Sequence, residues 1–404
     1  MKTIAIYTLT SELHDEAAVE TVTREFLSSL SIEYDFCGAN YSSFGTHPLD
    51  LIYVRTGGTE GLFRRLLPQL LQQSTRPMRL LTSGKNNSLA ASMEILSFLR
   101  QQNLNGEILH GSSDYVYRRI LLLAQAESGR RKLKGNHLGI IGAPSDWLIS
   151  SLADKEIVKE RLGIDLVELP MKELLDQINT TPPNPVNPAE YQGVPEVVRS
   201  SVAGAVQIYD ALKTIINRHQ LQGFTLRCFD LLSTVHNTGC LALARLNSEG
   251  IVAGCEGDVP AMLSMAVCQA LTGMSGFQAN PSRINTQTGE LLFAHCTIPL
   301  NMVEHYEFDT HFESGIGVGI RGYMKEGPVT LFKVSGDLSR SFIAEGELIR
   351  TLSESDLCRT QQVIRLADPR VTSYFLNNPI GNHHIIIPGH HKELLKEITL
   401  NLES

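Results

Sequence analysis

Two carboxylates and a cysteine stand where a strand-like segment gives way to a helix-like one, in the stretch GCEGDVPAMLSM at residues 254–265. Asp258 directly precedes Val259 and Pro260, and because Pro favours the first helical turn, Asp258 is placed to cap that helix by accepting backbone N–H groups. Glu256 has no capping role. It lies at the carboxyl end of a strand, where α/β folds gather their ligands, and is either a ligand there or a solvated loop residue.

Histidines in the last third of the chain could complete a metal site with Glu256. His295 lies in the apolar segment LLFAHCTIPL, where a neutral core histidine is the alternative. The tail GNHHIIIPGHH holds four of the thirteen histidines. Because successive side chains of a strand point to opposite faces, at most one of His383 and His384 reaches a given site. Imidazole nitrogen and carboxylate oxygen together suit Mn²⁺, Fe²⁺, Co²⁺ or Zn²⁺, although the short H-E-x-x-H motif is absent from the sequence.

The elements that must position these residues alternate between strand and helix in the first two thirds of the chain. Apolar runs such as TIAIYTL and MRLLTSG, with the helical spacing of SLAASMEILSFLRQQ, predict a largely parallel sheet covered on both faces. A basic helix-like segment at 115–134 precedes HLGIIGAPSDW, which opens a second α/β unit. From about 290 the segments are short, rich in β-branched and aromatic residues and separated by Gly turns, which predicts a mostly antiparallel, barrel-like domain.

The predicted fold class is therefore α/β, with two doubly wound, Rossmann-like parallel-sheet domains and a C-terminal mostly antiparallel β domain. The Pro- and Asn-rich stretch at 179–196 is predicted to be a loop or lid of the second domain. No G-x-G-x-x-G follows an N-terminal strand, and the one at 317–322 is interpreted as a β-domain turn, which disfavours a nucleotide-dependent dehydrogenase. The predicted domains are residues 1–134, 135–289 carrying Glu256 and Asn280, and 290–404 carrying His295 and the His383-His384 pair.

Composition and charge exclude several classes of function. The 404 residues, 42% of them hydrophobic, suffice for two or three domains with a real core. A net charge of -8 and a single short basic run at 129–135 argue against nucleic acid as a partner. No stretch reaches the roughly 18 apolar residues that a membrane span requires, and the opening MKTIAIYTLTSELHDE is better explained by a β-strand than by a signal peptide. Seven cysteines without a C-x-x-C pair suggest reduced thiols and a cytoplasmic protein.

The run AGCEGDVPAMLSMAVCQALTG, the segments FQANPSRIN and AHCTIPL, and the tail GNHHIIIPGHH resemble the L-fucose isomerase-like proteins, relatives of L-fucose isomerase and L-arabinose isomerase. The resemblance covers residues from about 220 to 404 and extends to the layout of two α/β domains followed by a β domain. It implies an enzyme that interconverts aldose and ketose sugars with a divalent metal, usually Mn²⁺, held by two carboxylates and one or two histidines. It also implies a homo-oligomer, a trimer or hexamer, with the active site near a subunit interface.

The resemblance assigns Glu256 as the first carboxylate ligand and places the second at position 280, where this chain has Asn280. An amide can coordinate through its oxygen, but it adds no negative charge and takes no proton at neutral pH. Either the metal is bound more weakly with Glu256 as the sole basic carboxylate, or Asp258 substitutes, or the chain has left isomerase chemistry.

Two histidine positions complete the implied metal site. His295 resembles the histidine that follows the second carboxylate in the arabinose enzymes, and the His383-His384 pair resembles their C-terminal pair, of which we favour His384 as the ligand. The predicted function is a metal-dependent aldose-ketose isomerase of carbohydrate metabolism that acts through an ene-diol, with Glu256 as ligand and candidate base. The alternative is a sugar-binding or regulatory protein, or a divergent enzyme on the same fold, in which Asn280 marks the loss of isomerase activity.

Overall fold

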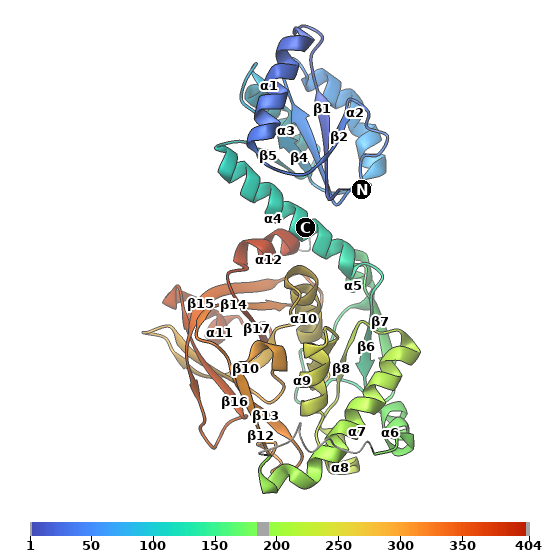
Figure 1. Ribbon diagram of the computed structural model, residues 1–404, viewed down its shortest axis with the longest axis vertical. Helices are drawn as coiled ribbons and strands as arrows, with labels where there is room; N and C mark the ends of the chain where they lie inside the picture. The colour runs from blue at the N-terminus through green and yellow to red at the C-terminus, as the bar shows by residue number, and fades with distance from the viewer. Residues whose placement is uncertain (1, 184–193, 401–404) are drawn as a thin grey trace. The chain divides into compact units, whose positions relative to one another are not determined.

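The computed structural model of the protein describes residues 2–183 and 194–400. The chain forms two compact units, Met1–Arg131 and Lys132–Ser404 (Figure 1). The predicted fold class is confirmed, because the described residues contain two parallel sheets with helices and a closed antiparallel barrel. Residues 184–193 of the predicted loop at 179–196 lie outside the described residues.

The first unit is a five-stranded parallel sheet in the order β2-β1-β3-β4-β5. Alternate residues of β1 point to opposite faces, so Ala5 and Tyr7 pack with α2 and α3, whereas Ile4 and Ile6 pack with α1 and α4. The elements are β1 (Ile4–Leu9), α1 (Glu16–Ser29), β2 (Asp35–Gly38), β3 (Leu49–Val54), α2 (Glu60–Gln73), β4 (Met78–Leu81), α3 (Ser88–Gln101), β5 (Gly106–Leu109) and α4 (Ser113–Leu133), which continues into the second unit.

The second unit begins with a four-stranded parallel sheet in the order β7-β6-β8-β9. The strand order reverses between β6 and β8, and ligands of α/β sheets bind outside the carboxyl ends of strands at such a point. The segments that follow β6, β8 and β9 are therefore the expected ligand-binding edge. The elements are β6 (His137–Ile141), α5 (Lys155–Leu162), β7 (Asp165–Leu169), α6 (Met171–Thr180), α7 (Glu196–His219), β8 (Gly223–Leu226), α8 (Asp230–Thr234), α9 (Cys240–Ser248), β9 (Val252–Cys255) and α10 (Val259–Thr272).

Six antiparallel strands close into a barrel in the order β10-β11-β16-β15-β14-β17, in which β17 pairs back onto β10. The expected domain boundary at 289/290 falls in the turn between the paired strands β10 and β11, so Asn280 lies on a barrel strand and not in a parallel sheet. The elements are β10 (Phe277–Asn285), β11 (Glu290–His295), η1 (Leu300–Met302), the hairpin β12 (His305–Asp309) and β13 (Gly319–Tyr323), β14 (Gly327–Val334), β15 (Ser341–Leu352), β16 (Thr360–Leu366), η2 (Pro369–Val371), α11 (Thr372–Asn377), β17 (His384–Pro388) and α12 (Lys392–Thr399).

Helix α10 joins the parallel sheet to the barrel. It contacts β8 and β9 of the sheet and β14 and β17 of the barrel, and Figure 1 shows it between the two layers. Nearly all of its side chains are buried, as expected for a helix that is apolar on every face. The turn before α10 therefore brings residues of the sheet edge close to residues of the barrel.

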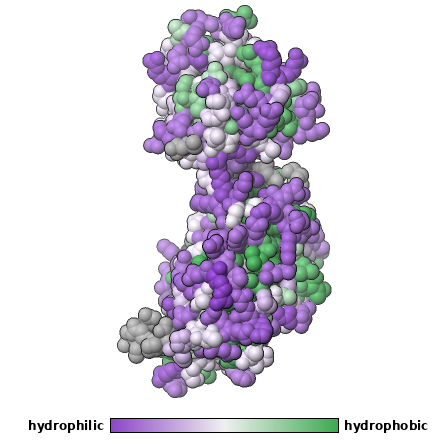
Figure 2. All heavy atoms as spheres, turned by 90° about the vertical axis from the view of Figure 1, so that its right-hand side faces the viewer, coloured by the Kyte–Doolittle hydropathy of each residue, from purple (hydrophilic) through white to green (hydrophobic). Residues whose placement is uncertain are grey.

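The surface is mostly hydrophilic on the face that Figure 2 presents, with apolar residues visible on parts of both units. Among the described residues, no helix has the length and apolar character needed to cross a membrane. Three exposed apolar side chains lie on the loop after β6, where Trp147, Ile149 and Leu152 are 53%, 92% and 72% exposed. This loop belongs to the edge at which ligands are expected.

Candidate active site

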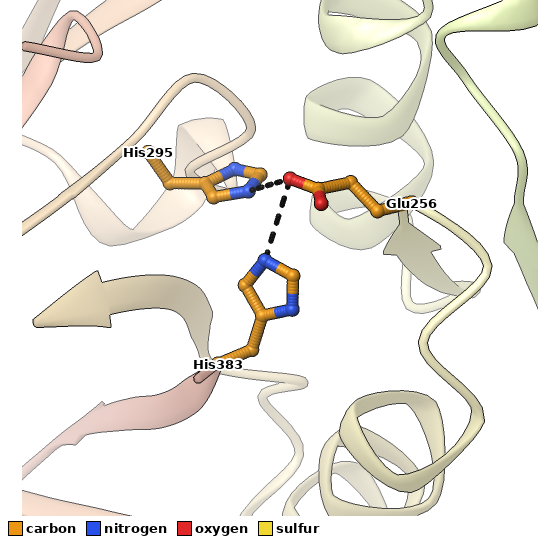
Figure 3. A group of neighbouring side chains, drawn as sticks. All are labelled: Glu256, His295 and His383. Atoms are coloured by element: carbon orange, nitrogen blue, oxygen red, sulfur yellow. Dashed lines mark ion pairs between the residues drawn. The ribbon is translucent and has the colours of Figure 1, made fainter. Parts of the chain in front are cut away.

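Glu256, His295 and His383 converge on one point inside the second unit (Figure 3). Glu256 follows β9, His295 ends β11, and His383 directly precedes β17. Glu256 Oε1 lies 3.5 Å from His295 Nε2 and 3.4 Å from His383 Nε2. All three side chains are buried, and their potential ligand atoms lie within 4.8 Å of one another. Such a group of one carboxylate and two imidazoles could hold a metal ion.

A hydrogen-bond partner on the Nδ1 side fixes the orientation of each imidazole ring. The Nδ1 atom of His295 lies 3.0 Å from the hydroxyl of Thr297, and Nδ1 of His383 lies 2.9 Å from Oδ2 of Asp258. Each Nε2 atom is thereby directed toward Glu256, in the arrangement by which outer partners orient metal-binding histidines. The Nε2 atom of His383 is buried and has no hydrogen-bond partner among the described residues. A buried nitrogen of this kind calls for a proton shared with a carboxylate or for a metal.

The backbone at Glu256 adopts an unusual conformation that aims its side chain. Glu256 has a φ of 63° and Gly257 a φ of 73°, and the left-handed region costs a non-glycine residue about 1–2 kcal/mol. Hydrogen bonds of 2.9 Å from Ser145 N to Glu256 O and from Gly257 N to Leu226 O hold this turn. The indole N–H of Trp147 donates to Glu256 Oε2 at 2.8 Å. One carboxylate oxygen is therefore held by Trp147, and the other faces the two imidazoles.

Gly257→Ala is expected to lower the free energy of unfolding by about 2–4 kcal/mol. An added Cβ would lie 2.4 Å from Ala143 O and 2.7 Å from Pro144 Cα, and neither backbone atom can move away easily. Gly273→Ala is the matched control, because Gly273 also has positive φ but a Cβ there meets nothing within 4 Å. That control should cost only about 1 kcal/mol in urea denaturation. Equal losses for the two variants would contradict the close approach at Gly257.

Asp258 caps α10 as predicted, because its Oδ1 atom accepts from Ala261 N at 2.8 Å. The carboxylate is fully buried and makes two further contacts that the sequence did not suggest. It accepts from His383 on one side, and the Lys333 ammonium, itself 1% exposed, lies 3.3 Å from it on the other. Asp258 contacts the Nδ1 side of His383 and is not part of the convergent group, so its place in the structure is to orient the His383 ring.

The carboxylates and the cationic groups of this cluster stabilise one another's charged forms. Burial opposes ionisation of Glu256, but His295 and His383 outweigh it and hold the pKa of this carboxyl well below its usual range. Burial likewise opposes ionisation of Asp258, yet Lys333 and His383 lower its pKa to about 2. Burial also opposes protonation of His383, but the two carboxylates raise its pKa to about 9. In the metal-free protein a proton on His383 thus lies between two carboxylates, where a cation is favoured.

Metal affinity is expected to rise about tenfold per pH unit between about pH 6 and about pH 8, because His383 must lose a proton to coordinate. Trp147 is the only tryptophan of the chain and contacts Glu256, so its fluorescence is the signal to follow in a titration with Mn²⁺. Titrations at several pH values, with proton release measured by calorimetry, check the expectation. Affinity that is independent of pH over this range would remove His383 from the ligand set.

The same raised pKa predicts how the stability of the metal-free protein depends on pH. Protonated His383 stabilises the fold fully below its ordinary pKa of 6.5, and this contribution is lost as the pH rises through about 9. Bound metal should remove this loss, since it takes the place of the proton.

Asn280 lies on the face of β10 that contacts the end of β9. Gln278 Oε1 accepts from Cys255 N at 2.9 Å, and its Nε2 donates to Cys255 O at 3.3 Å. Asn280 follows two residues later on the same strand, and alternate residues of a strand share a face. Its Oδ1 atom is buried and has no hydrogen-bond partner among the described residues. The amide oxygen is therefore available on the side of the strand from which Gln278 reaches the residue before Glu256.

His384, the favoured ligand of the pair, points into the barrel. Its Nε2 atom lies 3.0 Å from the hydroxyl of Tyr374 and its Nδ1 3.0 Å from Asn382 O. The ring packs against Phe375 with centroids 4.9 Å apart, and burial lowers the pKa of His384 to about 3. The structure thus places His383, and not His384, beside Glu256. Both ring nitrogens of His384 are engaged within the barrel core.

An aromatic wall beside Glu256 was not anticipated. Trp147 packs edge to face with Phe229 at 4.7 Å between centroids, and Phe229 packs likewise with His311 at 5.5 Å. The same loop as His311 carries the exposed Glu313, whose pKa is raised by partial desolvation and by the negative charge of Glu256. Trp147 and Phe229 follow strands β6 and β8, and a position just after a parallel strand is a sequence pattern that marks a candidate site residue. The loop of His311 and Glu313 has no such pattern.

Comparison with known proteins points to sugar isomerases. No protein-family model matches the chain. It is 23% identical over 267 residues to a sulfoquinovose isomerase of Priestia megaterium, a match of 62% of this chain and 59% of the relative. A sulfoquinovose isomerase of Alkalicoccus urumqiensis is 22% identical over 261 residues, or 61% of this chain and 59% of the relative. A third, from a Clostridium species, is 27% identical over 129 residues, or 31% of this chain and 27% of the relative. The matches thus cover less than two thirds of each relative.

Proposed function

We propose that the protein is a metal-dependent aldose-ketose isomerase of the L-fucose isomerase-like group. The observation that carries this proposal is the buried Nε2 atom of His383. It has no hydrogen-bond partner in the described part of the chain and faces, with Nε2 of His295, one oxygen of Glu256. The similarity to proteins named sulfoquinovose isomerase supports a sugar substrate. Sulfoquinovose is accordingly the first substrate to examine, beside L-fucose and L-arabinose.

The donor set fits a divalent cation such as Mn²⁺. Glu256, His295 and His383 would hold the ion, and the amide oxygen of Asn280 would be a fourth, uncharged donor. One carboxylate and two neutral imidazoles suit Mn²⁺, Fe²⁺, Co²⁺ or Zn²⁺. When bound, the metal supplies Lewis acidity that stabilises negative charge on the sugar oxygens.

The proton transfer between C2 and C1 of the sugar needs a base with a suitable pKa. Glu256 is a poor candidate, since its two imidazole neighbours hold its pKa far below neutrality. Glu313 is the better one, because partial desolvation and the charge of Glu256 raise its pKa, and its exposed carboxylate can exchange protons with solvent. We therefore assign Glu256 to metal binding and Glu313 to the transfer of the proton. Trp147, about half exposed and held by Glu256, offers a fixed apolar surface for the C–H groups of the sugar.

Asn280→Asp is expected to raise Mn²⁺ affinity about tenfold or more, because a second carboxylate adds negative charge to the donor set. Asn280→Ala, which removes the oxygen, should weaken binding instead. Fluorescence titration of Trp147 measures both variants under identical conditions. If neither substitution changes the affinity, Asn280 lies outside the coordination sphere and the metal is held by three residues alone.

Isomerisation in D2O tests the proposed chemistry. The sugars are incubated with the Mn²⁺-loaded protein and followed by NMR. A proton removed from C2 and returned to C1 through an ene-diol exchanges with solvent, so the ketose is expected to carry deuterium at C1. Ketose without deuterium would contradict transfer by a base that exchanges its proton with solvent, as the exposed Glu313 does. No ketose from any of the sugars would contradict the isomerase.

The expected homo-oligomer also belongs to this proposal. Ile149 and Leu152 are 92% and 72% exposed on the loop that carries Trp147, and exposed apolar side chains on one loop favour a protein contact. Such a contact would place the site near a subunit interface. Sedimentation velocity of the full chain tests the assembly, and a monomer at micromolar concentration would contradict it.

A further inference from the structure

Two buried thiols lie next to each other directly behind Glu256. Cys228 Sγ and Cys255 Sγ are 3.1 Å apart, and both cysteines are free. Cys255 ends β9, where it pairs with Leu226 at the end of the parallel strand β8, and Cys228 lies in the turn that follows β8, two residues after Leu226. The two sulfur atoms are closer than an ordinary non-bonded contact, so a cross-link requires them to approach by only about 1 Å.

Of these two cysteines, Cys228 lines a small pocket of the described structure and Cys255 does not. Cys228 is 8% exposed and lines a small pocket with Phe229, Thr238, Cys240 and His311, whereas Cys255 does not line it. A small oxidant in this pocket can therefore meet Cys228 first. Cys255, behind it, is positioned to react in the second step.

We propose that Cys228 and Cys255 form a reversible disulfide with hydrogen peroxide as the oxidant, a modification site that acts on the metal centre. In the first step the sulfur of Cys228 attacks one peroxide oxygen, the O–O bond breaks, and a sulfenic acid and one water form. In the second step the Cys255 sulfur attacks the Cys228 sulfur, the S–O bond breaks, and a second water leaves. Two thiols lose two electrons and two protons, and the peroxide is reduced to two waters.

The position of Cys255 connects this modification to the site. Cys255 directly precedes Glu256, whose φ of 63° leaves the backbone little conformational freedom. The backbone N–H and C=O of Cys255 are both hydrogen-bonded to the Gln278 side chain. A sulfur atom drawn toward Cys228 therefore pulls on the turn that aims Glu256 at His295 and His383. Oxidation is expected to lower Mn²⁺ affinity at least about tenfold. This consequence rests on the proposed metal role of Glu256, whereas the cross-link itself does not.

Non-reducing peptide mapping of the full-length protein tests the cross-link. After treatment with hydrogen peroxide, a peptide pair joining Cys228 to Cys255 with the loss of two hydrogens is expected, and dithiothreitol should restore both thiols. Cys228→Ser and Cys255→Ser should each abolish the pair. Cys37→Ser, in the first unit, is the control and should form it normally. A link between Cys228 and Cys240, or sulfinic and sulfonic acids alone, would overturn the proposal.

Mn²⁺ titration of reduced and oxidised protein tests the coupling to Glu256. The tenfold loss is expected in the wild type and absent in Cys228→Ser, which keeps Cys255 unlinked. Equal affinity of the reduced and cross-linked wild type would overturn the coupling. Failure of the reduced protein to bind Mn²⁺ at all would instead contradict the proposed function, while the peptide map still decides on the cross-link.

Discussion

Glu256→Gln is expected to abolish ketose formation and to weaken Mn²⁺ binding by about two orders of magnitude or more, while the protein stays folded. The amide can still accept from the indole N–H of Trp147, so the local packing is kept. The negative charge that attracts the metal is lost, however. Circular dichroism checks the fold, Trp147 fluorescence the metal, and a colorimetric ketose assay the activity. Unchanged turnover in this variant would remove Glu256 from the mechanism.

Glu313→Gln is the matched variant that separates metal binding from proton transfer. Its carboxylate is more exposed than that of Glu256 and lies outside the convergent group, so Mn²⁺ affinity should stay within about twofold of the wild type. Turnover should fall by about 10²-fold or more, as is usual when a general acid-base group is removed. A Glu313→Gln variant with full activity would return the base assignment to Glu256.

Asp258→Ala is expected to lower the free energy of unfolding by about 3–5 kcal/mol near neutral pH. The substitution leaves the Lys333 ammonium buried without its carboxylate, 3.3 Å away in the wild type, and removes the acceptor of His383 Nδ1. It also removes the cap on Ala261 N, which is worth about 1 kcal/mol. Chemical denaturation of the metal-free protein measures the loss. A loss below about 1 kcal/mol would contradict the buried ion pair as a stabilising contact.

Two companion variants separate these contributions. Asp258→Asn keeps a good helix cap and a hydrogen-bond acceptor but no charge. The decrease in its free energy of unfolding therefore measures the electrostatic contribution of Asp258. Asp258→Ala combined with Lys333→Met should recover a large share of the stability, since no unpaired charge then remains buried. If the double variant is as unstable as Asp258→Ala alone, Lys333 is not the group that needs Asp258.

Local signals explain which parts of the site could be predicted from the sequence. The cap at Asp258 and the start of α10 depend only on Asp258, Val259 and Pro260, and the structure confirms them. Glu256 was identified as a candidate because a strand end before a helix is a local pattern as well. The alternation of strands and helices likewise sufficed for the two parallel sheets.

Contacts between distant segments explain what could not be predicted. The choice between His383 and His384 depends on where β17 begins and which face it turns to the barrel, and both histidines fit the pattern equally well. Lys333 lies 75 residues from its partner Asp258, so no local pattern connects the two. The one sequence signal for a buried ion pair is the presence of a lysine in the apolar strand GPVTLFKV. The first barrel strand, β10, was assigned to the parallel domain because the residue composition of a strand does not show which strands it pairs with.

Ketose formation measured with Mn²⁺ and with excess EDTA, on sulfoquinovose, L-fucose, L-arabinose and other aldoses, tests the central claim most directly. We expect at least one of these sugars to be converted by the Mn²⁺-loaded protein, with turnover lost in EDTA and restored when Mn²⁺ is added back. Turnover that EDTA does not affect, or no turnover by a folded protein shown by Trp147 fluorescence to hold Mn²⁺, would contradict a metal-dependent sugar isomerase.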